Sequence, residues 1–545
     1  MTASPAPTAT SQANAGASAP DITTAGWDTV FALRLSQVND LIAAAVRRGD
    51  LTLPRLDWSE DQAGFSAPLI GFAFVGDPDL SGSQALVRMT FGPGKLTYIG
   101  AYAASGADLI GTLNLRRIDD PKFVSLSVQP ARDFVASRVD NLTLTDATGA
   151  PCARADVHNA YLKAAQAAIQ ADLTAFAPVL AQVSLQSALP DKARWLAPVA
   201  VGHCIAGGRD ATGDADKGST LAVLCMTDPF IKGNPLPPPS FDSRLIPPGC
   251  EAAFLISGPK FTRNLLFTGL AQTLFSPGVP LTPDKLADIE RNSLQIVGED
   301  VDQTISTRPG VGETSLGEIQ ADVSPLYGVF AEALLMPWLL PGAVLTLLGT
   351  VVGEMIAHGG HPNLIVPVEV RLTSLEVTRT GDSVHFRSGI HCPVNIGQLN
   401  VANITMTTDS TYRLVADKGG FQFVLDSSFV SSKDVGLPDW LKDGQTVAEV
   451  IATIVGLIIT VVTDGEAALL LTVAIGILAA SVESTPQLIA QGIAQGAGVA
   501  VPADFGGFVD VAVSPVSWLQ AASFDAQALQ LGEALLFAGA LSSKA

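Results

Sequence analysis

Ligand-type side chains come closest together in Glu354-Met-Ile-Ala-His358-Gly-Gly-His361. Histidine and carboxylate groups bind zinc when three or four of them converge. This segment is not an HExxH helix, because its glutamate precedes the first histidine by four residues. The glycines at 359 and 360 and Pro362 predict the end of a helix followed by a turn. We therefore expect an ordinary helix end here, with no metal and no cofactor.

A second group of possible ligands combines His385, His391 and Cys392. The two histidines can share one face of a strand, because their spacing is even. Metal-bound histidines usually have a carboxylate or carbonyl partner on the other ring nitrogen, and no carboxylate stands in register here. Ordinary strand positions are the expectation.

A glycine-rich loop carries Asp210, Asp214 and Asp216, which have calcium-ligand chemistry. The loop lacks the D-x-[DN]-x-[DN]-G order and the terminal glutamate of an EF-hand. We expect a solvated acidic loop and keep a calcium site as the alternative.

The common catalytic motifs are absent from the sequence. There is no GxSxG nucleophile elbow, and Phe91-Gly-Pro-Gly-Lys95 has neither the spacing of a phosphate-binding loop nor a helix after it. That segment predicts a hairpin turn. We expect a protein that is not an enzyme.

Charge and composition restrict the partners. The chain has 52 acidic and 32 basic side chains, a net charge of -20 and 15% charged residues. Nucleic acid is excluded, because its phosphates need a basic surface. Hydrophobic residues make up 48% of the chain and the mean hydropathy is +0.34. Either much of the chain is deeply buried, or part of it contacts lipid. We expect any transient contact with a membrane to be hydrophobic rather than electrostatic, because the protein is acidic.

The cysteines and the N-terminus bear on localisation. The five cysteines form no CxxC pair and are odd in number, so we expect buried free thiols. Residues 1–24 are rich in Ala, Thr, Ser and Pro and lack the basic and apolar regions of a signal peptide. We expect a disordered tail, and a protein that is cytoplasmic or exported by a non-Sec route.

The elements that position these residues follow from apolar periodicity. Trp27–Leu35 alternates as a strand and leads into a helix that we expect to be capped by Ser36. Ala153–Phe176 predicts one long helix with a wide apolar face, lying in the concavity of a curved sheet. Further strands and helices are expected at Ala67–Val75, Ala85–Phe91, Leu96–Ala101, Asp108–Leu115, Ala197–Ile205, Thr220–Met226, Ala252–Ile256, Phe261–Leu274, Pro283–Asn292, Leu364–Val430 and Gly507–Val516, with a very apolar stretch at Leu326–His358.

The most hydrophobic stretch is Val447–Ala480, broken once at Thr463–Glu466. Each arm is shorter than the roughly 20 residues that span a bilayer. A helical hairpin within a protein core is the favoured interpretation, and insertion into a membrane is the alternative.

Several segments resemble one protein family. Trp27-Asp-Thr-Val-Phe31 followed by Leu35-Ser-Gln-Val-Asn39, the strands Leu221–Thr227 and Ala252–Ser257, and the ending Ser514–Trp518 are similar to the OrfX/P47-type accessory proteins found with clostridial neurotoxins. The resemblance implies a tubular lipid-binding (TULIP) fold, in which long helices are wrapped by strongly curved antiparallel sheets around an apolar seam. The long N-terminal tail and the Ala- and Gly-rich composition depart from the family.

We accordingly expect an α+β, TULIP-like protein that binds a lipid or another elongated amphiphile without catalysis. Residues 25–310 form the first strand and helix region, and residues 311–545 form a second that contains the apolar hairpin 447–480. The alternative is an interaction subunit of a toxin or secretion assembly, or a component that inserts the hairpin into a membrane. The expected lipid contacts, each of which also suits core packing, are Val38, Leu41, Ile42, Val46, Tyr161, Ile169 and Leu173.

Overall fold

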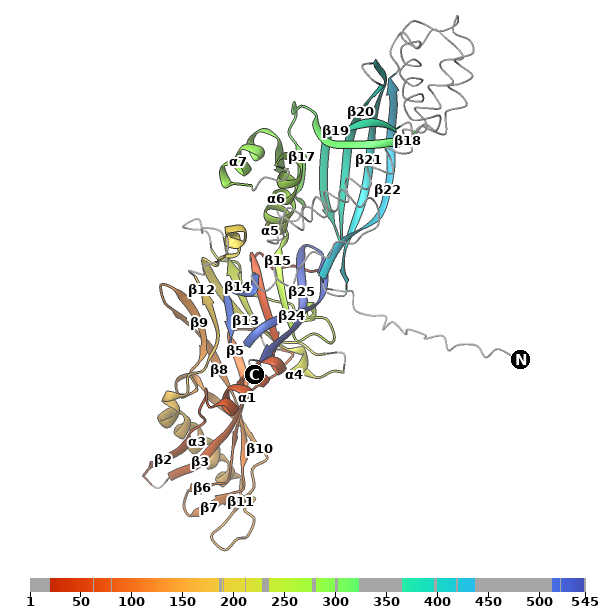
Figure 1. Ribbon diagram of the computed structural model, residues 1–545. Helices are drawn as coiled ribbons and strands as arrows, with labels where there is room; N and C mark the ends of the chain where they lie inside the picture. The colour runs from red at the N-terminus through yellow and green to blue at the C-terminus, as the bar shows by residue number, and fades with distance from the viewer. Residues whose placement is uncertain are drawn as a thin grey trace, which may run out of the picture.

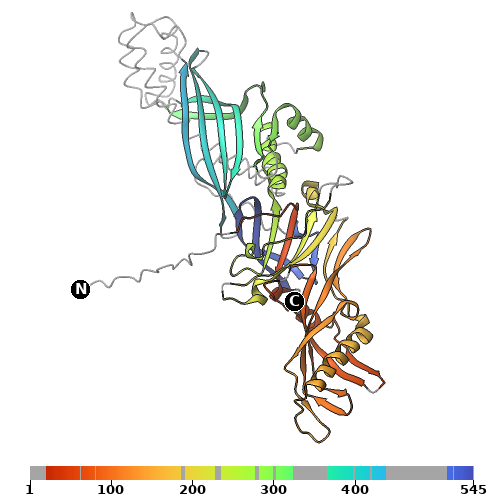
Figure 2. The ribbon, with the colours of Figure 1, turned by 180° about the vertical axis from the view of Figure 1, so that it is seen from behind.

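Three open antiparallel sheets account for most of the fold in a computed structural model (Figure 1). The structure describes residues 20–322, 365–436 and 512–543, with short gaps at 62, 80, 186–188, 190, 211, 228–234, 277–280, 299–301, 397–398, 418–419 and 520. The views from the front and from behind show an elongated molecule, with the sheet of β19–β22 at one end and β2, β3, β6 and β7 at the other (Figures 1 and 2). The described residues are mostly sheet with few helices, and the predicted wrapping of long helices by strongly curved sheets stays a prediction.

The central sheet has the order β24-β25-β15-β1-β14-β13-β4. Its middle strand β1 is buried on both faces. Phe31 and Leu33 belong to the main core, whereas Val30 and Ala32 face a smaller core. Residues of the proline-rich loop 235–251, which precedes β15, complete this smaller core. Burial on both faces explains the continuous apolar runs of the strands in this sheet. The bounds are β1 Thr29–Arg34, β4 Ser81–Gly82, β13 Ala200–Ala206, β14 Thr220–Met226, β15 Ala252–Ser257, β24 Ala521–Leu531 and β25 Ala534–Ser543.

The large sheet has the order β11-β7-β6-β3-β5-β8-β9-β12-β23, with β2 paired to β3 and β10 to β8. Its strands are β2 Arg55–Glu60, β3 Ala63–Val75, β5 Gln84–Phe91, β6 Gly94–Thr97, β7 Ala101–Ala104, β8 Ala107–Asp119, β9 Phe123–Val128, β10 Val135–Asp140, β11 Leu144–Thr145, β12 Val179–Ser184 and β23 Val516–Trp518. The single strand predicted at Leu96–Ala101 is wrong. The chain turns at residues 98–100, where Ile99 has a φ of 54°, and so forms the hairpin β6–β7.

The third sheet has the order β16-β17-β19-β20-β21-β22, with β18 on β19. Its long strands alternate between buried apolar and exposed polar side chains, as expected of an antiparallel sheet with one solvated face. The bounds are β16 Leu294–Val297, β17 Thr304–Thr307, β18 Thr314–Asp322, β19 Ile365–Thr380, β20 Ser383–Ile396, β21 Leu399–Asp417 and β22 Gly420–Gly436.

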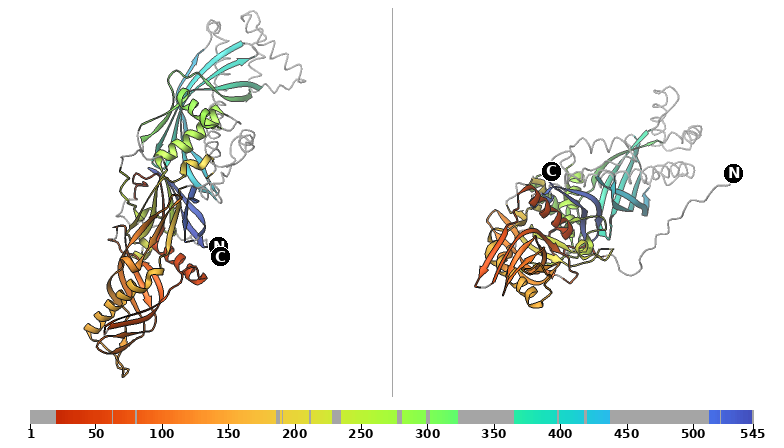
Figure 3. Two further views of the ribbon diagram at one scale, coloured as in Figure 1. Left: turned by 90° about the vertical axis from the view of Figure 1, so that its left-hand side faces the viewer. Right: turned by 90° about the horizontal axis from the view of Figure 1, so that it is seen from below.

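Two helices pack against the large sheet: α1 Leu35–Arg48 and α3 Ala155–Asp172, which runs on into a 3-10 turn at Leu173–Ala175. Figure 3 shows α3 lying along the strands of this sheet. Further helical segments of the described residues are α2 Pro130–Asp133, α4 Ala215–Gly218, α5 Gly258–Lys260, α6 Thr268–Leu270 and α7 Pro283–Asn292. There are also π-helical turns at Phe261–Phe267 and Ala271–Phe275 and 3-10 turns at Asp191–Leu196 and Ser243–Leu245.

Two further sequence predictions need correction. Ser36 does not cap α1, because the helix already begins at Leu35. The Ser36 hydroxyl instead donates to the carboxylate of Glu251 at 2.8 Å. The strand predicted to end at Val516 begins there, since Ala512 and Val513 form a helical turn. The Glu354–His361 segment, the stretch Leu326–His358 and the hairpin 447–480 lie outside the described residues. The predicted boundary at 310/311 stays a prediction.

Candidate functional site

The predicted lipid contacts come from two helices that both pack on β3. On α1, Val38, Leu41 and Ile42 are buried, with exposures of 0–3%, while Val46 is half-buried at the edge. On α3 and the turn after it, Tyr161, Ile169 and Leu173 are fully buried. The six buried side chains belong to one continuous apolar core.

The side chain of Asn39 attaches α1 to the edge of β3. Its amide nitrogen donates to the carbonyl oxygen of Phe74 at 2.9 Å, and its amide oxygen accepts from the N–H of Phe74 at 2.7 Å. Among the described residues, β3 pairs along Leu69–Val75 with β5 alone, so no strand lies at its other edge there. The amide of Asn39 therefore takes the place of a neighbouring strand. Sequence analysis missed this residue, although an asparagine inside an amphipathic helix is a usable signal.

Tyr161 places the one polar atom among the predicted contacts inside the apolar core. Its ring lies edge-on against Phe65 of β3, with centroids 5.3 Å apart, and Phe65 in turn meets Phe91 at 5.4 Å. The Tyr161 hydroxyl is buried and has no hydrogen-bond partner among the residues that the structure describes. Burial raises the pKa of this phenol, so it stays protonated and able to donate.

An aromatic cluster around β1 forms the part of this core that lies against the central sheet. Phe31 of β1 is contacted edge-on by Phe254, Trp518 and Phe524, with centroid distances of 6.0, 5.7 and 5.6 Å. In the central sheet, His203 of β13 is directly opposite Val223 of β14, and Val223 is directly opposite Phe31. Burial and the nearby Arg117 guanidinium lower the pKa of His203, so its neutral form is favoured.

Buried Arg34 connects the loop between β13 and β14 to the loop between β14 and β15. Its guanidinium donates to the carbonyl oxygens of Gly218 at 2.8 Å, Ser243 at 3.3 Å and Ile246 at 2.5 Å. Burial lowers its pKa, and the nearby carboxylate of Glu251 opposes that change. The arginine is 8% exposed, so these contacts indicate a structural clamp.

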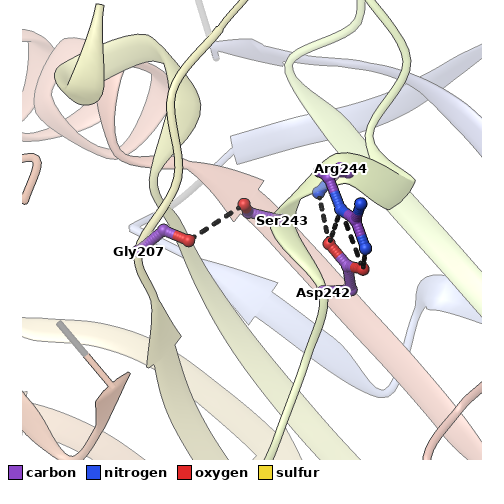
Figure 4. A network of polar contacts seen from close by, with 4 residues as sticks. All are labelled: Gly207, Asp242, Ser243 and Arg244. Atoms are coloured by element: carbon purple, nitrogen blue, oxygen red, sulfur yellow. Dashed lines mark hydrogen bonds and ion pairs between the residues drawn. The ribbon is translucent and has the colours of Figure 1, made fainter. Parts of the chain in front are cut away.

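Figure 4 shows a further link between the same loops, in which the Ser243 hydroxyl donates to the carbonyl oxygen of Gly207 at 3.1 Å. Beside it, the Arg244 guanidinium donates to both carboxylate oxygens of Asp242, from Nε at 3.0 and 3.1 Å and from Nη2 at 2.6 Å. The proline-rich loop is therefore tied down before it enters β15.

The three aspartates of the glycine-rich loop bind the backbone of the protein. Asp210 accepts from the N–H groups of Thr212 and Asp214, both at 2.8 Å. Asp214 caps α4 by accepting from the N–H of Asp216 at 2.9 Å, and Asp216 accepts from Gly76 at 2.5 Å. These bonds shape the loop and connect it to the end of β3.

The histidines of β20 lie on the exposed face of the third sheet, whereas Cys392 is buried on the opposite face. The expectation that no carboxylate pairs with them is wrong for His391. Its Nδ1 lies 2.7 Å from Glu313, a residue remote in sequence, and Arg371 joins Glu313 to Glu369 with contacts of 3.2 and 2.7 Å. Hydrogen bonds with these two carboxylates raise the pKa of Arg371.

The same face carries a shallow hollow of about 450 Å³. Its polar side chains form two cross-strand rows, one of Glu376, Arg387 and Asp409 and one of Thr378, His385 and Thr411. His385 Nδ1 lies 2.9 Å from the hydroxyl of Thr411. The lining combines the carboxylates of Glu376 and Asp409 with the basic side chains of Arg387 and His385. It therefore does not select one sign of ligand charge.

The described ranges hold neither a metal-ligand cluster nor a membrane-spanning helix. Within them, no three His, Cys, Asp or Glu residues are grouped as metal ligands would be. Over the same ranges, no helix combines the length and the hydropathy needed to cross a membrane.

Comparisons with known proteins give a match in fold. No family description matches the sequence, and no curated protein is significantly similar to it in sequence. The structure of P47 from Clostridium botulinum A2 matches with a TM-score of 0.56 and 12% identity, over 95% of this chain and 98% of that chain. P47 of Clostridium botulinum E1 matches with a TM-score of 0.55 and 11% identity, over 95% and 99%. At these identities the likeness shows the fold, and the predicted P47-type architecture is confirmed at that level.

A lipopolysaccharide binding protein also aligns over 95% of this chain and 99% of its own, at 12% identity. Its TM-score of 0.25 is too low to carry an argument about the fold.

Proposed function

We propose that this protein is a non-catalytic binder of lipids or other elongated amphiphiles, of the tubular lipid-binding type. The bound chain lies between α3 and β3, among Tyr161, Ile169 and Leu173. Each methylene moved from water into such an apolar environment stabilises the complex by about 0.8 kcal/mol.

The proposal rests on the buried hydroxyl of Tyr161, for which the described part of the chain offers no hydrogen-bond partner. A buried hydroxyl without a hydrogen bond costs about 1–3 kcal/mol. A well-packed core that served stability alone would favour phenylalanine here, because the ring already packs on Phe65. A carboxylate, ester or hydroxyl of an amphiphile would accept the bond that Tyr161 offers, while its chain would replace apolar contacts along α3.

The first test is native mass spectrometry of the freshly purified protein, followed by organic extraction and identification of what is released. We expect a lipid in stoichiometric amount. Because exchangeable lipid is lost on purification, saturable binding of a fluorescent fatty acid should be measured on the same sample. Absence of both bound lipid and saturable binding would contradict the proposal.

A matched pair of variants locates the site. Tyr161→Phe should weaken binding of the fluorescent fatty acid about three- to tenfold, the effect of losing one hydrogen bond. The same variant should be at least as stable as the natural protein without ligand, because it removes an unpaired buried hydroxyl. Tyr412→Phe, at a buried position of the third sheet, is the control and should leave the affinity unchanged. Equal affinities in all three proteins would place the ligand elsewhere.

A role as an accessory component of a toxin cluster is the second part of the proposal, and it is supported by the fold shared with the P47 proteins. It predicts that the protein associates with products of neighbouring genes. Size-exclusion chromatography of the mixed, purified proteins tests this, and elution of every component at its own volume would count against it.

A further inference from the structure

The apex of the β6–β7 hairpin carries the most exposed large apolar side chain of the described residues, Ile99, which is 77% exposed. The φ of Ile99 is 54°, in the left-handed region. A β-branched residue rarely adopts this conformation, since its side chain crowds the backbone there, whereas glycine adopts it freely. Because Ile99 is so exposed, core packing does not explain why this position holds an isoleucine.

The surroundings of Ile99 are unusual for so acidic a protein. From Tyr98 to Ala107 the chain has no charged residue. Tyr98 and Tyr102 flank the apex and are half-buried, so each presents an apolar ring with a polar end, the side-chain type that is enriched at membrane–water interfaces. Ala101 and Ala103 add small apolar side chains to the exposed surface. We call Tyr98–Ala103 the apolar tip.

The apolar tip is continuous with the α3–β3 core. Phe65, which packs on Tyr161, is directly opposite Leu96 of β6, and Leu96 is directly opposite Tyr102 of β7. One cross-strand row therefore leads from the proposed amphiphile site to the tip. β6 and β7 also lie near the end of the elongated molecule that is remote from the third sheet (Figure 1).

We propose that the apolar tip docks on a lipid surface by inserting Ile99 and the flanking tyrosines at the interface. The surface is uncharged or zwitterionic, because a protein of net charge -20 is repelled by anionic headgroups. The inference deepens the proposed function by naming where the protein meets lipid, but the docking itself does not need the Tyr161 site.

The experiment is cosedimentation of the full-length protein with phosphatidylcholine vesicles. Ile99→Asp should weaken binding about tenfold or more, because it places a charge where apolar surface is buried. Ile99→Gly should weaken it similarly while leaving the fold at least as stable in thermal unfolding, because glycine relieves the positive φ. Val297→Asp, at a 51% exposed valine of the third sheet, is the matched control and should bind as the natural protein does.

Three results would overturn the docking proposal: unchanged vesicle binding in both Ile99 variants, binding confined to anionic vesicles, or no binding to vesicles at all. Its failure is distinguishable from failure of the amphiphile site. The Ile99 variants should still bind a soluble fluorescent fatty acid, and Tyr161→Phe should still cosediment with phosphatidylcholine.

Discussion

The indole ring of Trp518 lies edge-on against the ring of Phe31, with centroids 5.7 Å apart and planes at 85°. Phe31 is in the middle strand of the central sheet, and Trp518 is in β23 at the edge of the large sheet. The contact therefore joins two sheets and two segments that lie near opposite ends of the sequence. Edge-to-face pairs of this kind add about 0.5–1.5 kcal/mol beyond the area they bury.

Replacing Trp518 should loosen the junction between the two sheets. Trp518 is 1% exposed, so Trp518→Ala should lower the free energy of unfolding by about 3–5 kcal/mol. Denaturant titration measures this, and hydrogen exchange should show faster exchange in β23–β25 than in β20. Exposed Ser517→Ala is the control, with little expected change. A loss below 1 kcal/mol for Trp518→Ala would show that the junction does not depend on this ring.

The amide of Asn39 should be necessary for docking α1. Asn39→Ala leaves the N–H and carbonyl of Phe74 without the partner they have now, at a cost of about 1–3 kcal/mol. Asp40→Ala, at the next and exposed position of the same helix, should change stability by less than about 0.5 kcal/mol. Equal effects of the two substitutions in denaturant titrations would mean that the Asn39 bonds contribute nothing specific.

His203 should make the protein sensitive to mild acid. Its pKa in the folded protein lies below the ordinary value of 6.5, so the unfolded chain binds the proton more tightly. The free energy of unfolding is therefore unaffected by His203 above the ordinary pKa. It decreases as the pH falls from that value toward the lowered pKa of the folded protein.

The measurement is the denaturation midpoint between about pH 7.5 and pH 5.5, where histidines change charge. His203→Leu should flatten this part of the pH profile. A profile equally steep in His203→Leu would assign the acid sensitivity to other groups.

Two cysteines should resist alkylation in the folded state. Burial raises the pKa of Cys204 and Cys225 to about 12, and the thiolate is the reactive form. Mass spectrometry after brief iodoacetamide treatment should find both unmodified, and modification should appear only in denaturant. Half-buried Cys152 provides the internal comparison and should react first. Rapid native labelling of Cys225 would show that β14 opens.

The sequence by itself determined the local elements and which of their faces are apolar. The strand Thr220–Met226 and the helix Pro283–Asn292 have the bounds that were predicted, because their patterns are uninterrupted and end at clear breakers. The long helix α3 follows from its alanines in the same way. Burial of Val38, Leu41, Ile42, Tyr161, Ile169 and Leu173 was likewise readable from helical periodicity.

Tertiary structure alone decided which remote residues meet. Glu313 reaches His391 and Trp518 reaches Phe31 only after strands far apart in sequence pair, and no local pattern specifies that pairing. The hairpin apex at Ile99 was hidden for a related reason, since isoleucine has a high strand propensity and the turn opposes it. Periodicity reports which face of an element is buried, whereas the partner of that face depends on how the whole chain packs.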